Sequence, residues 1–340
     1  MSATVLVTGG AGFIGSHTCV DLLQHGYEVV VVDDHSNSSP QALERVAKVA
    51  GRPVTATYVT DVRDRRALSA VFAAHSFDAV IHFAAKKAVG ESVHQPVEYY
   101  DTNVGGTTAL LSVMREHQVN RLVFSSSCSI YGDAADVPLT EHDPAGPTNP
   151  YATTKWQCEQ VLADVCRRLP DMHVLALRYF NPVGAHPSGL LGEDPRGVPN
   201  NVMPFLAQVA VGRLERLDVF GDDYATVDGT GVRDYIHVMD VAEGHRAALE
   251  HLGDESGMRV FNLGTGVGTS VLELVAAFSD ACGTPIPYRI AARRPGDVAA
   301  LVADPSAVAR AWNWATTRDL GTICRDAWRF QELNPSGYPA

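Results

Sequence analysis

The segment that decides the fold is Val5-Leu6-Val7-Thr8-Gly9-Gly10-Ala11-Gly12-Phe13-Ile14-Gly15. It begins as an apolar, β-branched run and continues into the glycines Gly9, Gly12 and Gly15, after which a helical pattern starts. A glycine-rich turn between a strand and a helix lets the backbone approach a pyrophosphate closely, and the helix N-terminus stabilises the charge. Because these glycines occur between a strand and a helix, they predict a dinucleotide-binding unit.

The second apolar run supplies a residue that discriminates between dinucleotides. The run Val29–Val32 ends in Asp33. A carboxylate at this point accepts hydrogen bonds from the adenosine ribose hydroxyls and repels a 2′-phosphate. The sequence therefore favours NAD over NADP as the cofactor.

Short apolar runs alternate with helix-length segments through the first half of the chain. Several runs are apolar at consecutive positions, which is typical of strands buried on both faces of a parallel sheet. The alternation predicts an α/β fold with a Rossmann-type, doubly wound parallel sheet. The predicted strands are Val5–Thr8, Glu28–Asp33, Thr55–Val59, Ala79–His82, Arg121–Ser125 and His173–Arg178, and the predicted helices are Phe13–His25, Pro40–Ala50, Arg65–His75, Tyr99–His117 and Tyr151–Leu169.

The alternation breaks after Phe180. The stretch Asn181–Asn201 is rich in Pro, Gly, Asn and His and is predicted to be a long irregular loop. Beyond it we expect a smaller mixed α/β domain, so the predicted division is an NAD-binding domain at 1–180 and a substrate domain at 181–340. Its predicted helices are Val202–Val211, Val241–His251, Ser270–Ala281 and Leu320–Gln331, and its predicted strands are Leu217–Phe220 and Val260–Leu263.

Composition restricts the possible partners and location. The chain has 340 residues, a formal net charge of −12 and six cysteines. The acidic balance argues against a nucleic acid or an anionic membrane as partner. The N-terminus runs directly into a strand, and no apolar run approaches the roughly 18 residues of a membrane helix, so we expect a cytoplasmic protein. The cysteines form no Cys-x-x-Cys pair and the histidines show no ligand spacing, so we expect neither disulfides nor a metal.

A second motif indicates acid–base chemistry. Tyr151 and Lys155 lie four residues apart on the helix predicted after Pro150, and therefore on one face of it. A neighbouring ammonium favours the phenolate and is expected to lower the pKa of the tyrosine toward neutral pH. Ser127 follows the strand Leu122–Ser125, at the edge of the sheet where a hydroxyl group can reach the same reacting group.

The glycine loop, the strand-end serine and the Tyr-x-x-x-Lys pair together resemble the extended short-chain dehydrogenase/reductase family. Longer strings spread over nearly the whole chain are similar to those of its UDP-glucose 4-epimerase branch. These strings are Thr8–Gly15, Phe83–Ser92, Arg178–Pro187, Pro199-Asn200-Asn201, Asp228–Val238 and Asn262-Leu263-Gly264.

The resemblance implies an NAD-dependent interconversion of UDP-glucose and UDP-galactose. It implies that Tyr151 takes the proton from the sugar 4-hydroxyl, that Ser127 orients this hydroxyl, and that Lys155 holds the cofactor ribose. The sugar would be oxidised transiently at C4, the 4-keto sugar would rotate, and the hydride would return to its other face. The resemblance also implies a homodimer, formed through the helices near Tyr99–His117 and Tyr151–Leu169.

The resemblance further implies which residues surround each ligand. Arg233 and Arg294 would bind the diphosphate, whose oxygens suit a planar guanidinium, and Asp297 would accept from the uridine ribose. The residues expected around NAD are Gly9, Gly12, Phe13, Ile14, Gly15, Asp33, Asn37, Ser38, Asp61, Val62, Phe83, Ala84, Lys87, Thr102, Tyr151, Lys155 and Phe180. Those expected around the UDP-sugar are Lys87, Ser127, Tyr151, Asn181, Asn201, Val202, Val219, Phe220, Arg233, Arg294, Asp297 and Leu301, with Val219 and Phe220 near uracil.

Three positions depart from the family pattern. Leu301 is intermediate between the bulky aromatic residue that excludes N-acetyl sugars and the small residue that admits them, so UDP-N-acetylglucosamine and UDP-N-acetylgalactosamine remain alternative substrates. Thr102 replaces an asparagine that some members have near NAD. Cys128 follows the serine where alanine is familiar.

Two other functions compete with this reading. A sugar-nucleotide 4,6-dehydratase needs an Asp-Glu acid–base pair beside the active-site hydroxyl, where this chain has Cys128 and Ser129. A catalytically silent dinucleotide-binding regulator needs the glycine loop but not Ser127, Tyr151 and Lys155 together, and groups with perturbed pKa values cluster at working sites.

Overall fold

The computed structural model describes residues 2–134, 136–195, 199, 201–254, 256–294 and 296–338. Asn200 of the string Pro199-Asn200-Asn201, part of the predicted loop 181–201, and Pro295 beside Arg294 lie outside the described residues.

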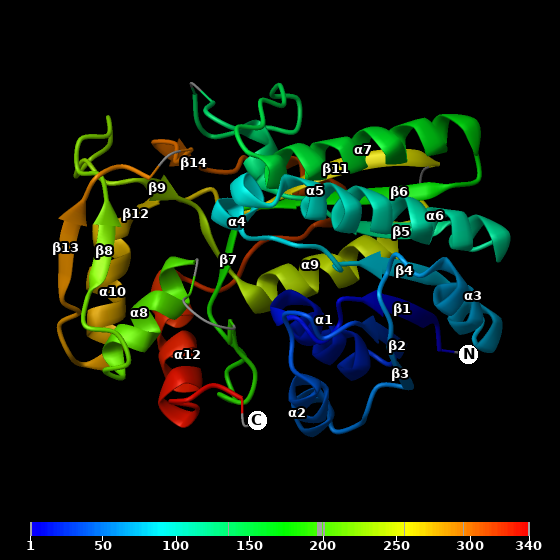
Figure 1. The fold of residues 1–340 in the computed structure, drawn as a ribbon, viewed down its shortest axis with the longest axis horizontal. Coiled ribbons are helices and arrows are strands. Elements are labelled where there is room, and N and C mark those ends of the chain that lie inside the picture. The colour runs from blue at the N-terminus through cyan, green and yellow to red at the C-terminus, as the bar shows by residue number, and fades with distance from the viewer. Residues whose placement is uncertain are drawn as a thin grey trace.

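One parallel sheet of seven strands organises the larger lobe, in the order β11-β6-β5-β4-β1-β2-β3 (Figure 1). Every neighbouring pair in it runs parallel, which confirms the predicted Rossmann-type, doubly wound sheet. The strands are β1 (Thr4–Thr8), β2 (Glu28–Asp33), β3 (Ala56–Val59), β4 (Ala79–His82), β5 (Arg121–Ser125), β6 (His173–Tyr179) and β11 (Gly257–Leu263).

Alternate residues of these strands enter two separate hydrophobic cores, one on each face of the sheet. Val5 and Val7 of β1 pack with helices α1, α2 and α9, whereas Leu6 packs with α3, α6 and α7. In Figure 1, α6 and α7 lie together at the upper right, and α1 and α9 lie together below them. Burial on both faces explains why the strands are apolar at consecutive positions. The helices are α1 (Phe13–Gln24), α2 (Pro40–Ala50), α3 (Arg65–Ala74), α6 (Gly106–Glu116), α7 (Pro150–Arg168) and α9 (Val238–His251).

The helix predicted at Tyr99–His117 is not continuous. The chain forms α4 (Val89–His94), α5 (Pro96–Tyr99) and a π-helical turn, Tyr100–Gly105, before α6 begins. Inside this turn the side chain of Asn103 is buried and hydrogen-bonded to the Lys86 backbone and to Thr154 Oγ1. Such turns often occur at functional sites, and here a tertiary contact that periodicity cannot reveal sets the local winding.

The smaller lobe is built around its own core, formed mainly by α8, α10, α12 and β8. Short sheets, β10-β7, β12-β9-β14 and β13-β8, join it to the larger lobe and form its outer edge. Its helices are α8 (Val202–Ala210), α10 (Val271–Cys282), α11 (Ser306–Trp312) and α12 (Leu320–Leu333), and its strands are β7 (Asn181–Val183), β8 (Leu217–Phe220), β9 (Val232–Arg233), β10 (Tyr235–His237), β12 (Thr269–Ser270), β13 (Tyr288–Ala291) and β14 (Ala300–Leu301).

The chain returns to the main sheet after its first departure. The predicted division at residue 180 follows the end of β6, but β11 then adds to the same sheet beside β6, in register from Gly257 to Leu263. Helix α9 also packs on α1 and contributes Val241, Ala247 and Ala248 to the core of the larger lobe. The larger lobe therefore includes segments from both halves of the sequence. No helix within the described residues has the length and apolar character needed to cross a bilayer.

Three buried histidines make stability depend on pH. Burial lowers the pKa of His17 and His82 to about 3 and of His245 to about 4, from 6.5. Below pH 6.5 the unfolded chain binds protons that the folded chain excludes, so stability is lost as the pH falls from 6.5 toward these lower values. We expect a loss of about 2 kcal/mol per histidine at pH 5, measured as a lower urea midpoint than at pH 7.

Matched variants separate this effect from general acid sensitivity. His245→Gln removes a buried titrating ring and should reduce the dependence of the urea midpoint on pH, whereas His94→Gln, at an exposed position of α4, should leave it unchanged. Equal midpoints for the unsubstituted protein at pH 7 and pH 5 would contradict the expectation.

Candidate active site

The glycine loop packs so closely that two of its glycines are required by the protein itself. Gly9 has φ +72° and donates its N–H to the Val32 carbonyl at 2.7 Å. A Cβ atom on Gly9 would lie 2.7 Å from the Ala84 nitrogen, and one on Gly15 would lie 2.2 Å from the Gly9 carbonyl oxygen. A Cβ on Gly12, by contrast, would meet only the Gly9 oxygen, at 3.3 Å.

The N-terminus of α1 is suited to an anion. Gly12 is its N-cap, and among the described residues no side chain caps it and its first turn has no acidic residue. Its first backbone N–H groups are therefore available to a ligand. Asp33 connects this loop to the next one by accepting hydrogen bonds from Ala11 N at 2.9 Å, His35 N at 2.9 Å and Ser38 Oγ at 2.7 Å.

The other residues predicted around NAD come from the carboxyl ends of successive strands, so the parallel sheet brings them to one edge. Phe83 and Ala84 follow β4, and their N–H groups are bonded to the Thr8 carbonyl at the end of β1. Asp61 and Val62 follow β3, and Phe180 follows β6. Asn37 is exposed in the loop beside Ser38, and Thr102 lies in the π-helical turn.

Ser127, Tyr151 and Lys155 lie where β5 ends against α7. Ser127 caps the 3₁₀ turn Cys128–Tyr131 (η2), and its hydroxyl accepts a hydrogen bond from Ser129 N at 3.2 Å. Lys155 is buried, donates to the Ser125 carbonyl at 2.7 Å and stands over the Phe124 ring. Asn149 caps the helix through Ala152 N and so places Tyr151 in its first turn.

The charge state of the pair differs from the prediction. Burial raises the pKa of Tyr151 to about 12, with a hydrogen bond from Ser127 acting in the lowering direction. Burial also lowers the pKa of Lys155 to about 8. In the protein without ligands the pKa of Tyr151 is therefore raised, opposite to the predicted direction, because desolvation of the phenolate is the largest effect on it.

The residues predicted around the nucleotide sugar are presented by several elements of the smaller lobe. In β9, Arg233 pairs with Leu301 of β14, and its charge acts on Cys128 beside Ser127. The guanidinium of Arg294 stands 4.4 Å from the centre of the Phe220 ring. Asp297 is exposed and is bonded through its backbone N–H to the Arg294 carbonyl.

Not every predicted side chain points toward the crevice between the two lobes. Val219 is 1% exposed and packs in the core of the smaller lobe, whereas its neighbour Phe220 is partly exposed beneath Arg294. Asn181 bonds through its backbone to Asp234, and its Oδ1 atom is buried without a hydrogen-bond partner within the described part of the chain. A buried polar atom without a partner is costly, so Asn181 fits a position that faces a bound ligand.

Two residues at the site were missed by the sequence analysis. Glu193 accepts hydrogen bonds from Lys87 Nζ at 2.6 Å and from Asn201 Nδ2 at 2.9 Å. It therefore connects Lys87, predicted near both NAD and the UDP-sugar, with Asn201, predicted near the UDP-sugar. Asn103, next to the predicted Thr102, bonds both to Thr154 of α7 and to the Lys86 backbone. The only signals for them were a lone acidic residue in a loop rich in Gly and Pro, and a lone Asn in a helical pattern.

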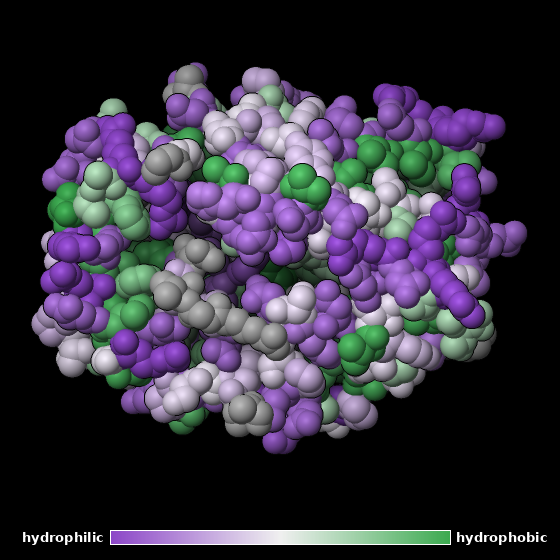
Figure 2. Space-filling view, viewed as in Figure 1, coloured by the Kyte–Doolittle hydropathy of each residue, from purple (hydrophilic) through white to green (hydrophobic). Residues whose placement is uncertain are grey.

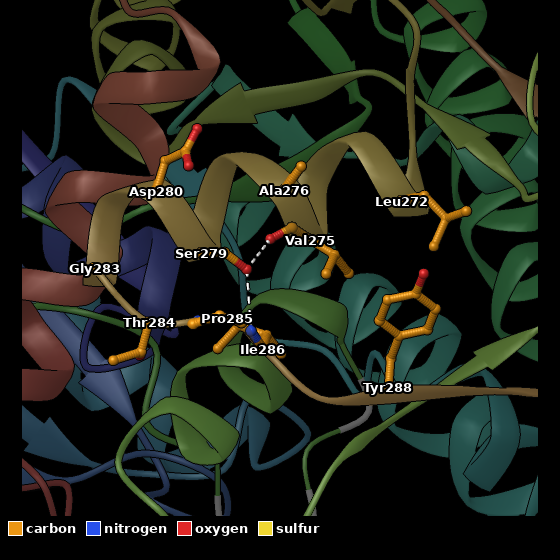
Figure 3. Close-up of a pocket in the computed structure, with 10 residues that line it drawn as sticks. All are labelled: Leu272, Val275, Ala276, Ser279, Asp280, Gly283, Thr284, Pro285, Ile286 and Tyr288. Atoms are coloured by element: carbon orange, nitrogen blue, oxygen red, sulfur yellow. Dashed lines mark hydrogen bonds between the residues drawn. The ribbon is translucent and has the colours of Figure 1, made fainter.

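The crevice is distinct from an apolar groove on the smaller lobe. Figure 2 shows the face on which the molecule is hollowed between the two lobes. The groove, of about 520 Å³, lies instead between α10 and β13 and is lined by residues such as Leu272, Ile286 and Tyr288 (Figure 3). None of the predicted site residues lines it. Within the described residues no group of three or more His, Cys, Asp and Glu side chains is arranged to hold a metal ion.

Comparison with known proteins places this geometry in a family. The chain is 54% identical over 334 residues to the UDP-glucose 4-epimerase of Bacillus subtilis, covering 98% of each chain. The chain belongs to the UDP-glucose 4-epimerase family. The crystal structure of the Bifidobacterium longum UDP-glucose 4-epimerase in complex with NAD⁺ and UDP is 52% identical, covers 99% of this chain and 100% of its own, and has a TM-score of 0.96. The UDP-Glc/GlcNAc 4-epimerase of Campylobacter jejuni is 35% identical, with a TM-score of 0.84 over 98% of this chain and 100% of its own.

A model of a broader family, described as GDP-mannose 4,6 dehydratase, matches residues 6–327. The site nevertheless holds Ser127, Cys128 and Ser129 in the turn where a dehydratase needs its carboxylates. Burial raises the pKa of Cys128 to about 12, so this thiol is a poor proton carrier. The chain is therefore an NAD-dependent isomerase of the epimerase family.

The difference between Gly12 and Gly15 can be tested directly. A methyl group on Gly12 would meet the Gly9 carbonyl oxygen at 3.3 Å, a tight contact that a small shift relieves, and would project where a pyrophosphate is expected to lie. We therefore expect Gly12→Ala to weaken NAD binding by about 10-fold or more, equivalent to ~1.4 kcal/mol, and to lower the melting temperature of the NAD-free protein less than Gly15→Ala does. Gly15→Ala should destabilise the NAD-free protein itself.

Titration of NAD and thermal unfolding measure the two effects. Gly90→Ala is the control, because a Cβ there meets nothing within 4 Å, and it should change neither. Unchanged NAD affinity in Gly12→Ala would show that the loop does not hold the pyrophosphate.

Proposed function

We propose that the enzyme interconverts UDP-glucose and UDP-galactose by removing hydrogen from C4 of the sugar and returning it to the opposite face. The observation that carries this proposal is the convergence of Ser127, Tyr151 and Lys155 at the sheet edge that also holds the Gly9–Gly15 loop. A hydroxyl, a phenol and an ammonium beside a dinucleotide loop are suited to moving a proton and a hydride together.

Tyr151 is the proposed acid–base group. Its phenolate takes the proton from the sugar 4-hydroxyl as C4 is oxidised, and the same group returns the proton when C4 is reduced. Ser127 donates to or accepts from that hydroxyl and holds it toward the phenol. The Ser127 side chain acts on the phenol of Tyr151 in the direction that lowers its pKa.

Lys155 supplies positive charge on the same side. The high pKa of Tyr151 in the ligand-free protein means that the site needs cationic neighbours before the phenol can act as a base near neutral pH. When bound, NAD supplies the hydride acceptor and donor for C4. The carboxyl-edge residues Asp33, Asp61, Phe83, Ala84 and Phe180 are the proposed binding groups for NAD, together with the other residues predicted for it.

The smaller lobe anchors the nucleotide while leaving the hexose free to turn. Arg233 and Arg294 are the proposed diphosphate ligands, and Phe220 packs on uracil. Near the proposed sugar position, Leu301 packs with Cys128 and Phe180 in one apolar cluster. An apolar wall offers no fixed hydrogen bonds to an oxidised sugar, so rotation about the diphosphate linkage costs little.

A second substrate class is proposed for the same chemistry. Leu301 is 8% exposed and packs against Cys128, so its branched side chain limits the space beside the serine without filling it as an aromatic ring would. The similar Campylobacter jejuni enzyme is a UDP-Glc/GlcNAc 4-epimerase, whose name includes both sugar classes. We therefore propose that UDP-N-acetyl sugars are secondary substrates.

The active unit is proposed to be a homodimer. Val93 of α4 and Val97 of α5 are 59% and 74% exposed, and both helices contact α7. Exposed apolar residues of this kind suit a helical interface between two copies of the chain.

Removing the phenolic hydroxyl tests the assignment of Tyr151. We expect Tyr151→Phe to keep NAD bound and to lower turnover of UDP-galactose by roughly 100-fold or more, the scale of acid–base catalysis. Tyr288→Phe, in the groove between α10 and β13, is the matched control and should retain full turnover. Near-normal turnover by Tyr151→Phe would reject the proposed mechanism.

Enlarging Leu301 tests the substrate range. We expect Leu301→Tyr to reduce kcat/KM for UDP-N-acetylgalactosamine at least about 10-fold more than for UDP-galactose, the scale of discrimination by pocket size. Assays of the two substrates side by side, before and after substitution, give the ratio. An equal loss on both would mean that Leu301 does not control access at the 2-position.

A further inference from the structure

Two consecutive serines at the end of β5 are hydrogen-bonded to one face of α7. The Ser125 carbonyl accepts from Lys155 Nζ, and Ser126 Oγ donates to Glu159 Oε1. The next serine, Ser127, acts on the pKa of Tyr151. Tyr151, Lys155 and Glu159 are spaced four residues apart, so they follow one another along a single side of the helix. The Ser125–Lys155 bond involves a residue of the proposed catalytic set, whereas the Ser126–Glu159 bond involves none.

Glu159 is held from the opposite side by a buried cation. Arg178 of β6 donates to it through two nitrogens, Nη2 to Oε2 at 2.6 Å and Nε to Oε1 at 3.0 Å. Arg178 is 5% exposed, Glu159 2% and Ser126 0%. Two parallel hydrogen bonds between a guanidinium and a carboxylate fix both position and orientation.

The connection continues from Arg178 back to the turn that carries Ser127. Arg178 Nη1 donates to the Tyr131 hydroxyl at 3.0 Å, and that hydroxyl donates to Asn262 Oδ1 at 2.7 Å. Tyr131 is the last residue of η2, whose first turn is capped by Ser127. The Ser125–Tyr131 segment is therefore held at its start by Glu159 and at its end by Arg178.

A buried ion pair is weak evidence for stability, because desolvation of the two charges offsets much of their attraction. Apolar residues of similar volume would fill the space between β5, β6 and α7 without that cost. What they could not supply is directional contact with Ser126 and Tyr131 on the two sides of the catalytic serine.

We propose that Glu159 and Arg178 are positioning residues that set the register between α7 and the Ser125–Tyr131 segment, and thereby the distance between Tyr151 and Ser127. The inference rests on the proposed function, since it concerns the geometry of that site. A displacement of about 1 Å between reacting groups is enough to cost ~100-fold in rate, so the contacts act on turnover and not on binding of the nucleotide.

The test uses the NAD-bound enzyme and two sets of substitutions. Ser126→Ala cuts one contact and leaves the ion pair intact, whereas Glu159→Leu/Arg178→Met removes both charges together and leaves no unpaired charge to prevent folding. Ser112→Ala is the control, because the hydroxyl of this partly exposed serine of α6 donates to the Thr108 carbonyl of the same helix. We expect kcat for UDP-galactose to fall at least about 5-fold in Ser126→Ala and ~10- to 100-fold in the double variant, with KM and NAD content unchanged.

The pH profile of the folded double variant reports the loss of the Glu159 charge. Burial lowers the pKa of Lys155, whereas Cys158 and Glu159 of the same helix raise it. Lys155 in turn lowers the pKa of His82 of β4. The double variant should therefore lose activity at a lower pH on the alkaline side than the wild-type enzyme. A folded double variant with wild-type kcat would overturn the proposal. Absence of epimerase turnover in the wild-type enzyme would instead reject the proposed function.

Discussion

The constraint on which the whole structure depends is the burial of a parallel sheet on both faces. Residues such as Leu6 and Val7 on adjacent positions of β1 enter different cores, so neither face can carry polar chemistry. Polar groups are then confined to the ends of the strands, and because the strands are parallel, their carboxyl ends share one edge. Asp33, Ser127 and Phe180 come from distant parts of the sequence and meet there for this reason.

The same burial determines the electrostatics of the proposed catalytic groups. It favours the neutral forms of both Tyr151 and Lys155, with pKa values near 12 and 8. The ligand-free site is thus poorly prepared to hold a phenolate. In the proposed mechanism a cationic ring and a sugar hydroxyl bound at the same edge would change that balance, so that ligand binding and activation of the base would be coupled.

Sequence patterns predicted the features that depend on local chemistry. The strand at Glu28–Asp33 and the helix at Pro40–Ala50 match the structure to the residue, since apolar runs and turn residues mark their ends. The patterns failed where a distant partner decides the outcome. The π turn near the start of a predicted helix contains Asn103, whose side chain contacts Lys86 and Thr154. The place of Glu193 at the site follows only from its contacts with Lys87 and Asn201. The pKa of Tyr151 was mistaken in direction because spacing shows a neighbouring charge but not the loss of water.

The return of β11 to the main sheet has a mechanical consequence. The chain leaves the larger lobe after β6, builds part of the smaller lobe, and then comes back to place α9 on α1 and β11 beside β6. Because the chain crosses between the lobes more than once, a relative movement of the lobes has to bend several connections together and not a single linker. In the proposed mechanism these connections hold the walls of the sugar space, while the turning motion belongs to the hexose.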